Sequence, residues 1–152
     1  MNWSDEGIVL SARKHGESAA IVTLLTRTNG RYSGLVHGGS GSRARGIYQT
    51  GNLVSADWRA RLSEHLGTMS CELLRPYSAA LMTERLPLLA LISAGAILER
   101  LLPEREPHPE TFERFQALIE SLGDGPDWVT GYVHWERRLL EDLGYGLDLT
   151  AC

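Results

Sequence analysis

The sequence predicts a small β-barrel followed by a helical module. Two observations support this fold class. Apolar and polar residues alternate through most of the first 75 residues, as they do in strands. In the remainder, apolar residues recur at spacings of three and four, as they do in helices. The 152 residues suffice for one medium domain or two small ones, and we place the boundary between residues 1–76 and 77–152.

Five short strands fill the first half, at residues 7–15, 19–27, 31–37, 52–62 and 68–74. Asn29-Gly30, before the third strand, is the dipeptide most typical of a tight hairpin. A long link, residues 38–50, follows that strand, and its "SRARGIYQ" portion suits a single helical turn. Five strands with a helix or long loop after the third is the order of an OB-type barrel. A small SH3-like barrel fits almost as well.

Three helical ranges fill the second half. The Ala- and Leu-rich residues 78–102 contain Pro87, which is expected to kink the helix or split it in two. Residues 109–123 begin with proline and end with glycine, the usual asymmetry of a helix. Residues 126–144 form the last range. Apolar stripes of this kind are more often core than binding groove.

The two halves differ in charge. Residues 1–75 carry nine Lys or Arg and six Asp or Glu, a net charge of +3. Residues 76–152 carry six Arg and thirteen acidic residues, a net charge of −7, so the whole chain is at −4. Such asymmetry indicates modules with different partners. Only the first half is a candidate for binding a polyanion.

Cysteine usage and hydropathy favour a cytoplasmic protein. Cys71 and Cys152 lie far apart and are expected to be reduced thiols. No early apolar run has the flanks of a secretory signal. The longest apolar stretch, residues 86–98, is interrupted and too short to span a bilayer.

The glycine-rich segment "GLVHGGSGSRARG", residues 34–46, allows two interpretations. A phosphate-binding P-loop needs a Gly-Lys-Ser/Thr ending, and this segment contains no lysine. A dinucleotide fingerprint needs a βαβ unit, which the alternating strands do not offer. We therefore expect a flexible tether that carries Arg43 and Arg45 to the phosphates of a nucleic acid, since arginine binds phosphate bidentately.

Neighbouring strands supply further candidates for nucleic-acid binding. The basic ones are Arg13, Lys14, Arg27, Arg31, Arg59 and Arg61. Tyr32 and Tyr48 are candidates for base stacking, and burial in the core explains them equally well. Trp58 lies on the apolar face of its strand and is expected in the core. His37 ends a strand beside the loop and is a candidate phosphate contact, although a surface histidine without a role is the simpler interpretation.

Catalytic and metal-binding signatures are missing from the sequence. It contains no Gly-x-Ser-x-Gly and no His-Glu-x-x-His motif. The five histidines lack a second ligand at zinc spacing. We expect no enzyme, no cofactor and no metal. Two alternatives stay open: an adaptor whose barrel binds protein or RNA, and an enzyme completed by another chain.

The segment "DEGIVLSARKHGESAAIVTLLTRTNGRYSGLVHGG" resembles the start of the RecO family of bacterial DNA repair proteins. "YQTGNLV", "LLPEREPHP" and "LLEDLGYGLDLTAC" extend the resemblance nearly from end to end. Each motif is loose, and their order and spacing together are fairly specific.

The resemblance implies an N-terminal OB-fold and a C-terminal helical domain. It implies a nucleoid-associated protein that binds single- and double-stranded DNA, anneals complementary strands and helps to load the recombinase RecA onto DNA coated with single-strand binding protein. RecR and the C-terminal tail of single-strand binding protein are the implied partners. No catalytic residues carry over. The implied DNA contacts are the basic residues of the barrel, Arg13, Lys14, Arg31, Arg43, Arg45, Arg59 and Arg61.

Two departures from the family qualify this expectation. Family members usually continue past this length, and some carry a zinc-binding cysteine cluster after the "LDL" segment, where Cys152 would be the first ligand. One cysteine cannot hold zinc, so no metal is predicted. The acidic helical half is expected to contact protein or support the barrel rather than bind DNA.

Overall fold

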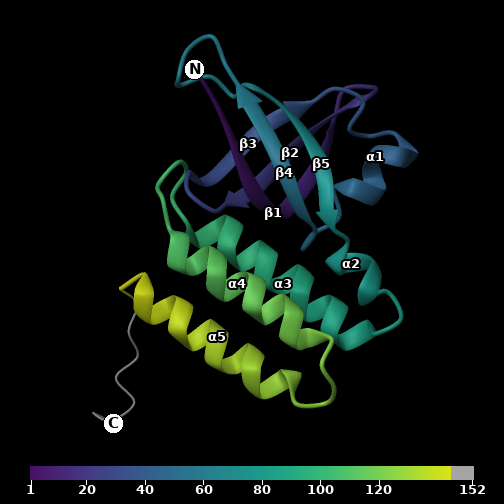
Figure 1. Cartoon of the computed structure of the whole chain (residues 1–152), viewed down its shortest axis with the longest axis vertical. Helices are drawn as coiled ribbons and strands as arrows, with labels where there is room; N and C mark the ends of the chain where they lie inside the picture. The colour runs from purple at the N-terminus through teal and green to yellow at the C-terminus, as the bar shows by residue number, and fades with distance from the viewer. Residues whose placement is uncertain (145–152) are drawn as a thin grey trace.

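A computed structural model describes residues 1–144 of the chain. A five-stranded barrel lies on a layer of helices (Figure 1). The barrel elements are β1 (Asn2–His15), β2 (Ala19–Thr26), β3 (Gly30–Val36), α1 (Ser42–Ile47), β4 (Leu53–Arg59) and β5 (Thr68–Arg75). The helical elements are α2 (Tyr77–Ala80), α3 (Arg85–Leu101), α4 (Pro109–Leu122) and α5 (Trp128–Asp142). The predicted fold class, a barrel followed by helices, is confirmed.

The strands close in the order β1-β2-β3-β5-β4. All pairings are antiparallel except that of β3 with β5, a parallel contact at Leu35 and Thr68. The first half of β1 pairs with β4 and its second half with β2, with a bulge between Val9 and Ser11. With α1 between β3 and β4, this is the OB-type order, and the SH3-like alternative is wrong.

The alternation of β1 creates two cores. Val9 faces the barrel interior, which also holds Trp58 at 1% exposure, so the prediction that Trp58 belongs to the core is confirmed. Ile8 and Leu10 point to the opposite face and pack against the helices together with Leu25. Successive side chains of a strand alternate between faces, and here both faces are apolar. The outer face of the barrel is therefore part of the helical core.

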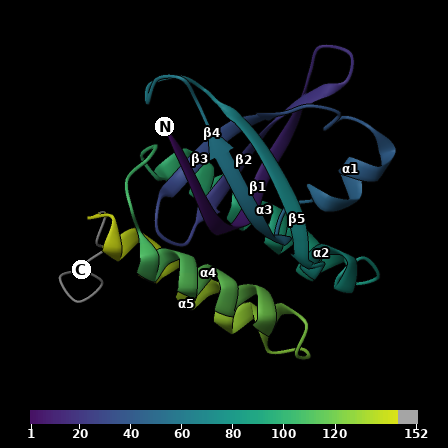
Figure 2. The same ribbon diagram turned by 45° about the horizontal axis from the view of Figure 1, so that its top comes forward.

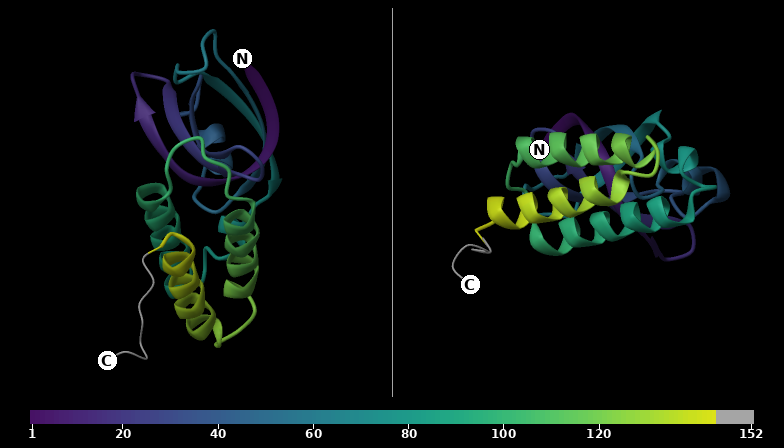
Figure 3. Two further views of the ribbon diagram at one scale, coloured as in Figure 1. Left: turned by 90° about the vertical axis from the view of Figure 1, so that its left-hand side faces the viewer. Right: turned by 90° about the horizontal axis from the view of Figure 1, so that it is seen from below.

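The predicted helices form with adjusted ends. The range 78–102 is split as expected, but the break lies at residues 81–84. Pro87 instead lies in the first turn of α3, where its missing N–H breaks no intrahelical hydrogen bond. Helix α4 begins at Pro109 and is capped by Gly123, as predicted. Helix α5 packs across α3 and α4 on the side away from the barrel (Figures 2 and 3).

The glycine-rich link is folded onto the barrel, so the expectation of a flexible tether is wrong. The Gly39 N–H donates to the Val36 carbonyl, and the Ser40 N–H to that of Ser18, each at 3.1 Å. The buried Asn52 amide donates to two backbone carbonyls of α1 at 3.1 Å. The expected helical turn does form as α1. No helix within residues 1–144 is long and apolar enough to cross a membrane.

Candidate nucleic-acid interface

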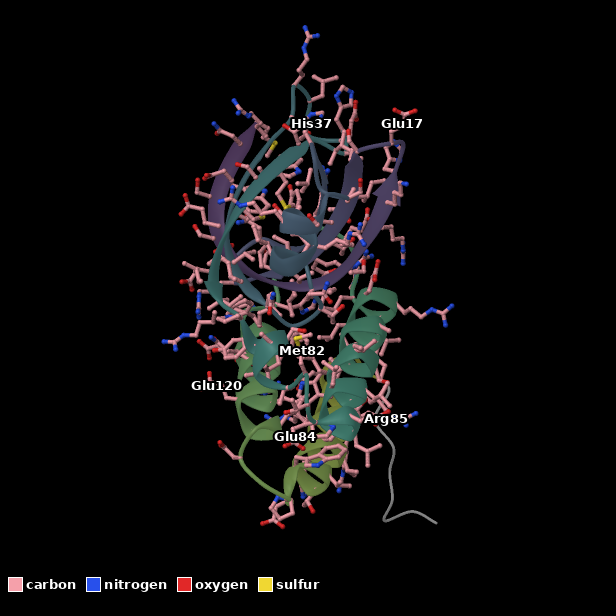
Figure 4. The ribbon with its side chains drawn as sticks, turned by 90° about the vertical axis from the view of Figure 1, so that its right-hand side faces the viewer. Glu17, His37, Met82, Glu84, Arg85 and Glu120 are labelled. Atoms are coloured by element: carbon pink, nitrogen blue, oxygen red, sulfur yellow. The ribbon has the colours of Figure 1, made fainter. Side chains whose placement is uncertain are left out.

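The end of the barrel farthest from the helices carries several loops side by side. Figure 4 shows Glu17 and His37 there, whereas Glu84 and Arg85 lie on the helical module. The hairpin between β1 and β2 contacts the link before α1, because the Ser40 hydroxyl donates to the Glu17 carbonyl at 3.3 Å. Short loops of this kind form the binding edges of OB-folds.

A cleft of about 1060 Å³ opens between α1 and strands β4 and β5. His37, Arg43 and Arg59 all line it, so the structure brings together three residues that are 22 positions apart at most. Polar groups of Asp57 and Ser70 share its walls. The volume is that of a ligand-binding pocket.

A second cleft of about 690 Å³ continues from the first. Both are lined by Asn2, Arg59 and Thr68, and the second adds Arg61 and His65 from the loop between β4 and β5. That loop is one of two that OB-folds use to hold oligonucleotides. We call the joined clefts the distal groove, defined by its five basic residues His37, Arg43, Arg59, Arg61 and His65.

The arginines of the distal groove are available to a ligand. Arg43, Arg59 and Arg61 are exposed and form no ion pair with any residue in the described part of the chain. Asp57 is the acidic member of the lining, and its carboxylate accepts a hydrogen bond from Ser4. Cations free of internal partners suit phosphate binding, since arginine donates bidentately to phosphate oxygens.

The floor of the groove is electrically neutral. Burial raises the pKa of the Cys71 thiol to about 11, with Asp57 adding to the rise and a hydrogen bond with Tyr48 opposing it. Burial foremost, and then Cys71, raises the pKa of Tyr48 above its ordinary value. A protonated thiol is a poor nucleophile, so Cys71 is not an activated cysteine. Tyr48 is 7% exposed and is not free to stack on a base.

Arg31 and Tyr32, two of the predicted DNA contacts, are not among the residues that line the groove. The Arg31 guanidinium donates to the Leu102 carbonyl at 2.8 Å and lies 3.6 Å from the Glu104 carboxylate. Tyr32 is 7% exposed because strand alternation points it inward, between Trp3 and Trp58. Both side chains serve internal contacts.

The remaining predicted cations divide between the two ends of the barrel. Arg13 pairs with Glu99 of α3 at 3.2 Å, facing the helices. Arg27 pairs with Glu6 at 2.8 Å and lies 4.5 Å above the ring of Phe112. Lys14 near the end of β1 and Arg45 on α1 are exposed and are not among the residues that line the distal groove.

Sequence reasoning missed Arg105. It lies in the turn-rich "PEREPHP" connector, and no pattern there singles it out. Its guanidinium is 4.7 Å from the Tyr32 ring centre and 5.1 Å from that of Trp58. Among residues 1–144, no group of three or more His, Cys, Asp or Glu side chains could hold a metal ion. Cys152, the possible zinc ligand, lies outside the described residues.

A closed five-stranded barrel with a helix between its third and fourth strands defines an OB-type protein, a class that binds oligonucleotides and oligosaccharides. The chain belongs to the recombination protein O family: the N-terminal family model matches residues 1–77 and the C-terminal model residues 82–152. The resemblance seen in the sequence is thereby confirmed.

Curated relatives match the whole chain. A protein named DNA repair protein RecO from Rhodospirillum centenum is 51% identical over 152 residues, and the chain covers 60% of that relative. Proteins of the same name from Rhodospirillum rubrum and Afipia carboxidovorans are 45% and 47% identical, with 62% and 61% of their lengths covered. The chain therefore spans about 60% of the length of these relatives.

Proposed function

We propose that this chain binds DNA through the distal groove and acts as a recombination mediator in DNA repair. In this role it anneals complementary strands and assists a recombinase to assemble on DNA coated with single-strand binding protein. Family membership supports the repair role. The observation that carries the DNA-binding part is the groove itself, which unites Arg43, Arg59 and Arg61 on one exposed surface.

Charge favours this end of the molecule over the other. The barrel half is at +3 and the helical half at −7, so a polyanion is attracted to the groove and repelled by the helices. The division of labour follows: residues 1–76 bind DNA and residues 77–152 support the barrel and contact proteins. RecR and the C-terminal tail of single-strand binding protein are the proposed partners of the complete mediator, which acts without catalysis of its own.

Fluorescence anisotropy of a labelled single strand, titrated at several salt concentrations, tests the proposal. A log–log slope near −3 is expected, corresponding to about four phosphates. The variant Arg43→Ala/Arg59→Ala should flatten the slope to about −1.5. Arg85→Ala/Arg100→Ala removes the same charge from exposed positions of α3 and should leave the slope unchanged.

Two results would contradict the proposal. Equal losses in both double variants would mean that overall charge, not the groove, governs binding. The second result has two parts: an RNA strand of the same sequence, at equal concentration, displaces the DNA completely, and the protein does not anneal complementary strands. This combination would favour the adaptor function instead.

A further inference from the structure

We infer that Arg105 is a positioning residue for the distal groove: it holds the loop between β4 and β5, residues 60–67, in the place where that loop completes the groove. The inference rests on the proposed function, because it concerns the same surface. It assigns to the helical module a direct influence on the DNA-binding end of the barrel.

The connector between α3 and α4 reaches the barrel through backbone contacts. The Arg105 N–H donates to the Arg31 carbonyl at 2.8 Å, and Glu104 forms a β-bridge with Arg31. Arg105 has a φ of 61°, a left-handed conformation that costs non-glycine residues energy. The surrounding contacts therefore hold the residue in a strained backbone conformation, and this conformation directs its side chain to the barrel.

The Arg105 guanidinium contacts three groups at once. It lies over the rings of Tyr32 and Trp58, at 4.7 and 5.1 Å, and its Nη2 donates to the His65 carbonyl at 2.6 Å. Only a planar, multi-donor cation combines ring stacking with a directed hydrogen bond in this way. The aromatic core of the barrel thus fixes the guanidinium, and the guanidinium fixes the loop.

The loop has few other attachments along its exposed stretch. Both of its ends are held. Ala60 exchanges two hydrogen bonds with Met1, the Trp58 indole donates to the Leu66 carbonyl at 3.0 Å, and the Leu35 N–H donates to the Gly67 carbonyl at 3.0 Å. Its middle contains a turn in which the His65 N–H donates to the Leu62 carbonyl at 3.1 Å, and the Leu62 side chain is 54% exposed. Arg61 and His65, which line the groove, belong to this stretch. The hydrogen bond from Arg105 is therefore the tether of His65 itself, whereas Arg61 follows the anchored Ala60.

The surroundings of Arg105 argue against direct contact with a phosphate. Glu64 and Glu104 line the same small depression as Arg105, and their charges disfavour an anion there. Arg105 is half-buried behind the loop, whereas Arg61 is exposed on it. We therefore assign Arg105 to placing the loop and Arg61 to contacting the DNA.

Two measurements on the full chain test the inference. Hydrogen exchange of the amides of residues 61–67, without DNA, reports the placement of the loop. Anisotropy with a labelled single strand reports affinity. Arg105→Ala should accelerate exchange in the loop and weaken DNA binding about 3- to 30-fold, the usual range for indirect coupling. Arg105→Lys keeps the charge but not the planar fork, and should resemble Arg105→Ala in both. Arg85→Ala is the control and should change neither.

A double variant separates positioning from contact. If Arg105 acts through the loop, Arg61→Ala/Arg105→Ala should bind DNA about as weakly as the weaker single variant, because the losses share one cause. The melting temperature identifies any variant that fails to fold. If Arg105→Ala fails to fold, the same two measurements are made on Arg105→Lys.

Several results would overturn the inference. Weaker binding with unchanged loop exchange would make Arg105 a direct contact. Faster exchange with unchanged binding would mean that the placement of the loop does not matter. If Arg105→Lys bound DNA as tightly as the unaltered chain, the positive charge of Arg105 would matter and its planar guanidinium would not. If the unaltered chain binds no DNA, the proposed function fails and the effect on affinity fails with it, while the exchange result still shows whether Arg105 holds the loop.

Discussion

The guanidinium of Arg31 donates a hydrogen bond to the backbone carbonyl of Leu102 at 2.8 Å, across the boundary between the barrel and the helical module. Leu102 is 1% exposed, so its carbonyl has little access to water. A strand arginine that composition assigns to DNA is thus used to satisfy a helix terminus.

Arg31→Ala should destabilise the fold by about 1–3 kcal/mol, because a buried carbonyl loses its donor. The log–log slope of DNA affinity against salt concentration should equal that of the unaltered chain, because the Arg31 side chain does not line the distal groove. Urea unfolding and anisotropy measure the two effects. Arg75→Ala, an exposed strand arginine without an ion pair among the described residues, is the control. A flattened slope with unchanged stability would show that Arg31 contacts phosphate after all.

Gly30→Ala should be far more destabilising than Gly16→Ala, although both glycines have positive φ, of 78° and 69°. A Cβ at Gly30 would lie 2.1 Å from the Glu106 carbonyl oxygen, whereas one at Gly16 meets open space. Backbone strain costs either variant about 1–2 kcal/mol. The clash adds roughly 1–3 kcal/mol at Gly30 alone. Equal melting temperatures would mean that the connector is not seated against the barrel.

Asn52→Ala should cost roughly 2–4 kcal/mol, since it leaves several buried groups unpaired. The Asn52 amide donates to the carbonyls of Gly46 and Ile47, and its oxygen accepts from the Ser78 N–H at 3.0 Å. DNA affinity should also fall, because α1 forms one wall of the groove. Asn29→Ala is the comparison variant and should cost less, because its half-buried amide donates to the Asp5 carboxylate at 2.9 Å and its loss leaves no backbone group unpaired. Thermal unfolding of Asn52→Ala within a degree of the parent would contradict this role.

The stability contributed by Cys71 should decrease at high pH. Burial raises its pKa from 9.0 to about 11 in the folded state, so the folded chain binds the proton more tightly than the unfolded chain. This contribution is complete below about pH 9 and is lost as the pH rises through about 11. The free energy of unfolding, measured from pH 7 to 11, should therefore fall less in Cys71→Ala than in the unaltered chain. Alkylation of Cys71 at pH 8, in a Cys152→Ala background, should be about 100-fold slower than that of a free thiol. A fast reaction would place the thiol at the surface.

Periodicity predicted the elements well because the barrel and the helices bury their faces regularly. It missed the start of β1, since "NWSDE" lacks alternation and is held as strand by pairing with β4. It extended β4 to residue 62, because Ala60 and Leu62 continue the pattern by chance beyond Arg59, where the strand ends.

The site was harder to predict than the fold. Arg43, Arg59 and Arg61 stay predicted DNA contacts, and the structure places all three in the lining of the distal groove. The internal use of Arg31 could not be seen, because its acceptor is a backbone carbonyl 71 positions away. For Tyr32, the sequence left base stacking and burial in the core equally open. Only the structure shows that its side chain points from β3 into the barrel interior. Arg105 could not be predicted, because only its tertiary contacts with two rings and a carbonyl single it out.

The two faces of β1 have a consequence for how the chain comes apart. Val9 belongs to the barrel interior, while Ile8 and Leu10 belong to the core shared with the helices. Neither core can open without disturbing this strand, so unfolding should be one cooperative transition rather than two. A barrel truncated after residue 76 would expose the apolar outer face of β1 to water. Such an exposed apolar patch promotes association with other molecules.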